Sequence, residues 1–189
     1  MDRDPEIHFS VSHTTRRPRA GERDGVDYSF VNQERFEELV KSGAFVEYAD
    51  YAGNRYGTSW QAIDEPLQAG RDLLLEVEVQ GARLLRARRP DARFVFLLPP
   101  SMEELERRLR GRGTDTPAAV EQRLSIVRTE LAAVHDFDYA VVNQDLEATV
   151  AILLEIVAAE RAGEAQEVRA RYGREVTLSC LKGRLPIPD

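Results

Sequence analysis

The sequence is poor in the residues that usually build disulfides and metal sites. It contains a single cysteine, Cys180, among 189 residues. No disulfide can therefore form within the chain, and a reducing cytoplasm is the expected setting. The three histidines, His8, His13 and His135, lack the spacing of metal ligands, which argues against a structural zinc site. We predict no metal site built from the side chains of this chain.

The chain also lacks a hydrophobic run long enough to cross a membrane. The apolar run of residues 151–159 contains Glu155 and is too short for a bilayer, and residues 1–9 are too charged for a signal peptide. The net charge of -7 argues against broad binding to nucleic acid or to membranes. A chain of 189 residues fits one domain with a sizeable core.

Strand patterns alternate with helix patterns along most of the chain, which predicts an α/β domain with a parallel sheet. Residues 10–70 differ, because short strands at 8–12, 27–31 and 45–51 surround a loop and a turn at 52–57. We expect buried strands at 72–79, 93–100 and 139–144. Capping residues Asn32, Ser59, Ser101 and Thr116 open several of the helices, which we expect at 33–42, 60–70, 80–89, 102–112, 118–134 and 146–172.

An arginine-rich loop stands out in this acidic chain. Residues 12–28 read SHTTRRPRAGERDGVDY and include Arg16, Arg17, Arg19 and Arg23. Guanidinium groups can grip a phosphate in pairs of hydrogen bonds, and Gly and Pro can hold such a loop in one shape. The alternative is a solvated basic surface loop, which is what most charge runs are.

The order of several motifs resembles the guanylate kinase family. After the arginine-rich loop come FVEYA, GNRYGTS, EVQG, LPPS, RLRGRGTDT and VVNQD, and the likeness runs from Phe9 to Arg161. It implies a P-loop nucleoside-monophosphate-kinase core with a mixed GMP-binding lobe and a helical lid. It also implies transfer of the γ-phosphate of ATP to GMP with Mg²⁺, a step of purine nucleotide metabolism. We expect one domain, with the lobe at 10–70, the core at 71–106 and 137–162, the lid at 107–136 and a C-terminal extension at 163–189.

The resemblance assigns a GMP pocket to residues of the lobe and of one core strand. Guanine presents N1–H and N2–H₂ donors beside the O6 acceptor, so a carboxylate and hydroxyls can read it, and adenine would leave those buried groups unpaired. Arg16, Arg19, Tyr28 and Tyr56 would hold the phosphate of GMP. The guanine would be read by Ser12, Glu47, Thr58 and Glu78.

The resemblance also assigns residues to the ATP side. Arg108, Arg112 and Arg123 match lid arginines that close on the phosphates, where one positioned arginine is worth about 10³–10⁵ in rate. Asn143 matches an asparagine near the adenine, and Arg112 would contact ATP as well. Glu76 would act in catalysis, but Glu76 and Glu78 stand where the family usually has aspartates. The longer side chain shifts a carboxylate by about an ångström, which is enough to lower catalysis.

The 189 residues contain no G-x-x-x-x-G-K-[ST] phosphate loop. Eleven residues precede Ser12, without glycine or lysine, and neither Lys41 nor Lys182 has the required spacing. We therefore expect the fold to lack its first, P-loop strand, with no visible motif for Mg²⁺ and doubtful ATP binding. Residues 175–181 (EVTLSCL) are the candidate for a strand that fills the vacant place in the sheet.

Three functions remain open at this point. In the first, the chain would be a guanylate kinase whose N-terminus is truncated, with little or no phosphate transfer by the sequence as written. Alternatively, it is a non-catalytic module that binds GMP or a phosphorylated peptide through Arg16 and Arg19. A nucleic-acid binder rests on the arginine cluster alone and conflicts with the acidic balance.

Overall fold

The computed structural model describes residues 3–111, 116–181 and 183–188, and the chain divides into two compact units, Met1–Ala92 and Arg93–Asp189. The first unit contains, in chain order, β1 (Ile7–Phe9), β2 (His13–Thr14), β3 (Ser29–Phe30), α1 (Gln33–Lys41), β4 (Phe45–Tyr51), β5 (Asn54–Ser59), α2 (Trp60–Gln68), β6 (Asp72–Leu74) and α3 (Val79–Arg88). The second contains β7 (Val95–Leu98), α4 (Met102–Gly111), α5 (Pro117–Glu130), the 3₁₀ helix η1 (Leu131–Asp136), β8 (Tyr139–Val142), α6 (Leu146–Ala162), α7 (Gln166–Tyr172) and α8 (Arg174–Cys180).

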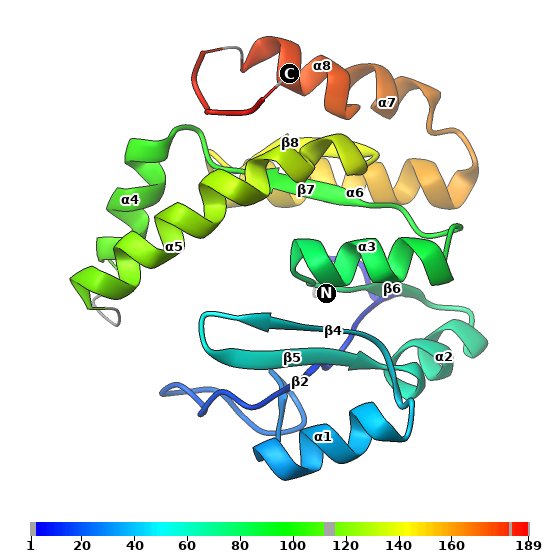
Figure 1. Ribbon diagram of the computed structural model, residues 1–189. Coiled ribbons are helices and arrows are strands. Elements are labelled where there is room, and N and C mark those ends of the chain that lie inside the picture. Colours follow the sequence, from blue (N-terminus) through cyan, green and yellow to red (C-terminus); the bar gives the residue numbers. More distant parts are fainter. Residues whose placement is uncertain (1–2, 112–115, 182, 189) are drawn as a thin grey trace. The chain divides into compact units, whose positions relative to one another are not determined.

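A small mixed sheet with the strand order β3-β2-β5-β4 dominates the first unit. Its two longest strands form the antiparallel hairpin of β4 and β5, which lie side by side in Figure 1. Ala52 and Gly53 make the turn, with φ of 47° and 79°, the left-handed backbone that tight hairpins require. The predicted turn over 52–57 is therefore too long, because Asn54 to Gly57 already pair with β4.

Two helices of this unit begin at the predicted capping residues. The Asn32 side chain accepts a hydrogen bond from the backbone N–H of Arg35 at 2.8 Å, and Ser59 accepts one from Ala62 at 3.2 Å. Capping of this kind satisfies N–H groups that the first helical turn leaves unpaired. The α1 helix then places Phe36, which is fully buried, against the ring of Phe45 on β4.

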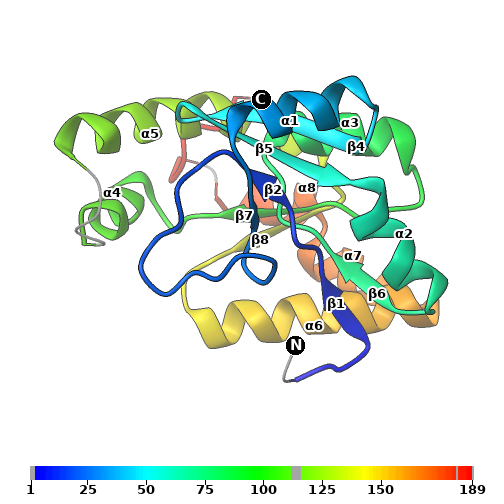
Figure 2. The same cartoon turned by 90° about the horizontal axis from the view of Figure 1, so that it is seen from below.

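A second, two-stranded sheet pairs β1 with β6 in parallel, as Figure 2 shows. The predicted buried strand over 72–79 is wrong beyond Leu74. Pairing with β1 stops at Phe9 opposite Leu74, and Leu74 is 44% exposed. Without a ladder to continue, the chain passes the exposed Glu76 and enters α3, with Glu78 at the N-cap position.

The second unit is built on the parallel pair β7 and β8, and Figure 1 shows α7 and α8 running over β8. Thr116 caps α5 as predicted, by accepting a hydrogen bond from the backbone N–H of Ala119.

Glu160 on α6 accepts hydrogen bonds from Tyr139 at 2.5 Å and from Arg169 and Arg93 at 2.8 Å each. These bonds connect β8, α7 and the residues just before β7 to α6.

Two predictions for the C-terminal part are wrong. The long helix expected over 146–172 ends at Ala162, because Gly163 adopts φ of 73° and closes α6 in the left-handed conformation. Residues 175–181 form helix α8 and its end, and not a strand. The Thr177 hydroxyl donates to the carbonyl of Ala140 at 2.7 Å, and Leu178 and Leu181 enter the core beside Leu131.

The expected α/β class is confirmed, with parallel strand pairs and a separate mixed sheet. In the part of the chain that the structure describes, no helix has both the length and the apolar character needed to span a bilayer.

Candidate functional site

A chain of hydroxyl hydrogen bonds leads to one buried carboxylate in the mixed sheet. Glu47 on β4 lies opposite Thr58 on β5 in the strand register, and the Thr58 hydroxyl donates to Glu47 Oε1 at 2.5 Å. The Ser12 hydroxyl lies 3.1 Å from that of Thr58. Because the Thr58 hydroxyl donates its proton to Glu47, the Ser12 hydroxyl is the donor and Thr58 the acceptor in this second bond. The structure thus brings together three residues that the sequence assigned to one subsite.

Burial governs the electrostatics of this carboxylate. Glu47 is only 4% exposed and Thr58 is fully buried. Burial raises the pKa of Glu47 above its ordinary value of 4.5, and the hydrogen bonds from Thr58 oppose that rise. A carboxylate held in this way is oriented by Thr58 and still has acceptor capacity for a ligand.

Gly81 on α3 makes room for this carboxylate. A Cβ added to Gly81 would overlap Glu47 Oε2. The same helix is fastened to β4 by Arg88, whose guanidinium donates to the carbonyl oxygens of Phe45, at 3.1 Å, and Val46. Sequence reasoning included Gly81 in the EVQG motif but gave it no role. Its signal was a glycine inside a helix, where alanine is preferred.

In the arginine-rich loop, the guanidinium of Arg16 is held by several partners. Its guanidinium makes a bidentate pair with Glu22 at 3.0 and 2.8 Å and donates to the carbonyl of Arg17 at 2.8 Å. The group lies 5.4 Å from the centre of the Tyr28 ring and 5.8 Å from that of Phe30. Hydrogen bonding to Glu22, and more weakly to Tyr56, raises the pKa of Arg16.

Both tyrosines assigned to the phosphate lie beside Arg16. The rings of Tyr28 and Tyr56 meet edge to face, with centroids 6.1 Å apart. Burial raises the pKa of Tyr28, and the charge of Glu76 adds to this rise. Glu76 therefore lies within electrostatic reach of the tyrosine pair, although its side chain is exposed.

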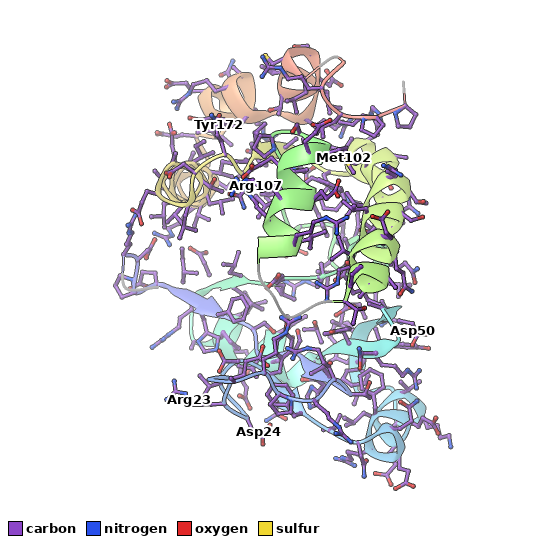
Figure 3. The ribbon with its side chains drawn as sticks, turned by 90° about the vertical axis from the view of Figure 1, so that its left-hand side faces the viewer. Arg23, Asp24, Asp50, Met102, Arg107 and Tyr172 are labelled. Atoms are coloured by element: carbon purple, nitrogen blue, oxygen red, sulfur yellow. The ribbon has the colours of Figure 1, made fainter. Side chains whose placement is uncertain are left out.

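Other assigned residues are less closely gathered. The Arg19 side chain is exposed, and its backbone N–H donates to Glu22 at 2.6 Å. Glu78 is half-buried at the start of α3. Arg23 lies on the outer side of the loop, as Figure 3 shows, and is exposed like Arg17. Glu22 was not among the assigned residues, although an acidic residue within a run of arginines is a visible signal.

The second unit holds the residues assigned to the ATP side. Arg108 donates to Glu104 at 2.7 Å and to the carbonyl oxygens of Asn143 and Gln144 at 2.8 and 3.0 Å. Arg107 on the same helix, labelled in Figure 3, also donates to Glu104. These two arginines lower the pKa of Glu104 to about 2. Arg108 and Asn143 are thus brought together.

The other two arginines assigned to the ATP side are Arg123 and Arg112. Arg123 is half-buried on α5, whereas Arg112 lies outside the described residues. The Asn143 side chain accepts from the Thr149 hydroxyl at 3.4 Å.

Within residues 3–111, 116–181 and 183–188, no cluster of three or more His, Cys, Asp or Glu side chains is arranged to hold a metal ion.

Comparison with known proteins agrees with the motifs. The sequence model of the family described as Guanylate kinase matches residues 2–160. The guanylate kinase of Parasynechococcus marenigrum (strain WH8102) is 54% identical over 147 residues, which are 78% of this chain and 81% of that protein. That of Streptomyces coelicolor is 52% identical over 143 residues, 76% of this chain and 73% of the relative. The crystal structure of guanylate kinase from Anaplasma phagocytophilum superposes with a TM-score of 0.71 at 32% identity, and covers 97% of this chain and 87% of its own.

Proposed function

The chain belongs to the guanylate kinase family, and on that basis we propose that its first unit binds GMP as the acceptor of a phosphoryl group from ATP. The relatives named above are guanylate kinases, and their reaction is the one for which these residues are suited. The single observation that carries the proposal is the buried chain Ser12–Thr58–Glu47.

The chemistry of this chain of hydroxyls and carboxylate matches guanine. The Glu47 carboxylate has one oxygen bonded to Thr58 and can accept from the N1–H and N2–H₂ groups of guanine. Adenine has no N1–H and carries an amino group where guanine has O6. It would leave the buried carboxylate without a donor, which costs about 1–3 kcal/mol for each unpaired group. The proposed specificity is for GMP over AMP.

The phosphate would meet Arg16, Tyr28 and Tyr56. The guanidinium of Arg16 is held over the Tyr28 ring, and Tyr56 lies next to both. A guanidinium and two phenol hydroxyls can donate to the three oxygens of a phosphate monoester. Arg19 would swing in from the surface, because its side chain is exposed in the structure.

The donor half of the reaction is less complete in these 189 residues. The family uses Mg²⁺ with ATP, and the described side chains form no cluster of three or more His, Cys, Asp or Glu residues that could hold a metal ion. The sequence contains no glycine-rich phosphate loop with its lysine. We expect Arg108, Arg112 and Arg123 to bind phosphate oxygens, Asn143 to lie near adenine and Glu76 to act close to the acceptor. Transfer by the 189-residue polypeptide is expected to be slow or absent.

A phosphorylated peptide is the second candidate ligand. Arg16 already holds a carboxylate from its own chain, Glu22, in a bidentate pair, so the same loop can take an anion carried on a peptide. The Ser12–Thr58–Glu47 chain would have no function in such binding. A peptide ligand should therefore be insensitive to changes at Glu47.

Titration calorimetry on the 189-residue polypeptide tests these alternatives. We expect GMP to bind, AMP to bind at least about 100-fold more weakly, and Glu47→Gln to remove most of this difference. A coupled assay of ADP formation from ATP and GMP measures transfer. Absence of GMP binding would refute the proposal, and binding of a phosphoserine peptide with unchanged affinity in Glu47→Gln would favour the second candidate.

A further inference from the structure

The hydrogen bonds of Arg16 divide its guanidinium into two edges. An arginine carries five N–H donors in a planar group. In the structure, Nη1 donates to Glu22 Oε2 and to the Arg17 carbonyl, and Nη2 donates to Glu22 Oε1. Three donors are therefore used at the Nη1–Nη2 end of the group. The two donors that these bonds leave, on Nε and Nη2, lie along one side edge with the spacing of a bidentate contact, and Tyr56 is a further, weaker partner of the same guanidinium.

Glu22 is itself fixed by more than the arginine. Its Oε2 atom also accepts from the backbone N–H of Arg19 at 2.6 Å. The Arg16 and Glu22 side chains are 14% and 19% exposed, respectively, so the pair is largely removed from solvent. The Arg16 backbone N–H is bonded to the Thr14 hydroxyl at 3.1 Å. The loop thus closes on a single carboxylate that joins one guanidinium and one backbone amide.

We infer that Glu22 is a positioning residue for the phosphate of GMP. By holding the Nη1–Nη2 end of Arg16, it directs the Nε–Nη2 edge toward two phosphate oxygens. This inference rests on the proposed function, because it assigns the phosphate to GMP bound by Arg16. A preorganised guanidinium loses less conformational entropy on binding than one that must first be ordered.

Glu22 also has an electrostatic effect that opposes its positioning role. The negative charge of Glu22 also repels a phosphate, and a simple competitor for Arg16 would weaken GMP binding. Glu22 and the phosphate do not compete directly, because the carboxylate and the phosphate use different N–H donors of the Arg16 guanidinium. Release of Glu22 would also break its bond to the Arg19 amide and open the loop. The positioning effect is therefore the larger one, and removal of the carboxylate should weaken binding.

The test compares GMP with guanosine, which lacks the phosphate, in titrations of wild type, Glu22→Gln, Arg16→Ala and the double variant. We expect Glu22→Gln to raise the Kd for GMP about tenfold and to leave the Kd for guanosine unchanged. In the Arg16→Ala background, Glu22→Gln should cause no further loss, because it acts through Arg16. Asp27→Asn is the matched control, since Asp27 accepts from the Arg23 amide of the same loop at 2.7 Å and has no bond to Arg16. It should leave GMP affinity within about twofold of wild type.

A ligand-free measurement separates this inference from the proposed function. In ¹⁵N NMR spectra, the Nη groups of Arg16 should give separate, slowly exchanging signals in wild type that merge in Glu22→Gln. Unchanged or tighter GMP binding in Glu22→Gln would overturn the inference while leaving the GMP site intact. A wild-type chain that does not bind GMP would instead overturn the proposed function, and unchanged Nη signals in the variant would then refute the holding of Arg16 by Glu22.

Discussion

Gly81 on α3 packs directly against the carboxylate of Glu47 on β4. A Cβ at position 81 would overlap Oε2 and lie 3.0 Å from Cδ of Glu47. Glycine costs roughly 1 kcal/mol relative to alanine inside a helix, and this position lies within α3. Glycine at position 81 therefore lowers the stability of the helix but leaves the space that the buried Glu47 carboxylate occupies.

The first prediction concerns this contact. Gly81→Ala should weaken GMP binding at least about tenfold, because the added methyl group displaces Glu47 and breaks its 2.5 Å bond with Thr58. Titration calorimetry measures the affinity, and circular dichroism checks that the fold is kept. Gln80→Ala, on an exposed position of the same helix, is the control and should bind like wild type. Equal affinity in Gly81→Ala would show that Glu47 does not touch the ligand.

The second prediction removes the hydroxyl between Ser12 and Glu47. Thr58→Val keeps the shape of a fully buried side chain but leaves Glu47 Oε1 without its donor. An unpaired buried acceptor costs about 1–3 kcal/mol, so urea denaturation should show a loss of unfolding free energy of that size. The ratio of GMP to AMP affinity should fall in the same variant.

Thr58→Ser is the matched variant, because it retains the hydroxyl and loses one methyl group. It should keep the preference for GMP. If Thr58→Val and Thr58→Ser behaved alike in the affinity ratio, the hydroxyl chain would have no part in reading the base.

The third prediction is a pH dependence. Burial raises the pKa of Glu47 above 4.5, so the folded chain protonates this group more readily than the unfolded chain does. The stability that this proton contributes is present below pH 4.5 and is lost as the pH rises through the folded-state pKa. Guanine needs the ionised form. The affinity for GMP should therefore fall as the pH is lowered toward the folded-state pKa.

Glu47→Gln separates this effect from titration of GMP itself, whose phosphate has a pKa near 6. The ratio of wild-type to variant affinity, measured by calorimetry between pH 7.5 and pH 5, should decrease with pH because only wild type carries the carboxylate. A ratio that stays constant over this range would mean that Glu47 keeps its charge throughout or makes no contact with guanine.

Local signals predicted several of these features from the sequence. The capping residues Asn32, Ser59 and Thr116 open helices where expected, because a cap depends on neighbouring residues only. The order of the motifs also gathered Ser12, Glu47 and Thr58 in one subsite, which strand pairing brings together from separate segments.

Features that depend on distant contacts could not be predicted. Residues 175–181 have the composition of a strand, but Leu178 and Leu181 lie on one side of a helix and fill the core beside Leu131. Tertiary packing overrides local propensity in such short apolar segments. The acidic residue among the arginines is visible in the sequence, but its pairing with Arg16 could not be predicted, because charges in a loop carry no pattern that states which of them meet.

The last prediction concerns the C-terminal segment that the sequence left without a role. Leu181 is 5% exposed and packs with Leu131, Val134 and Leu185 against the β7–β8 pair. Leu181→Ala should lower the free energy of unfolding by about 2–5 kcal/mol, the usual cost of a buried leucine truncated to alanine. Val176→Ala is the control on the same segment, because Val176 is 39% exposed, and it should cost less than about 0.5 kcal/mol. Equal midpoints for the two variants in urea denaturation would contradict a core role for the segment. Since Leu181 belongs to the second unit, GMP binding by the first should be unchanged in Leu181→Ala wherever the chain stays folded.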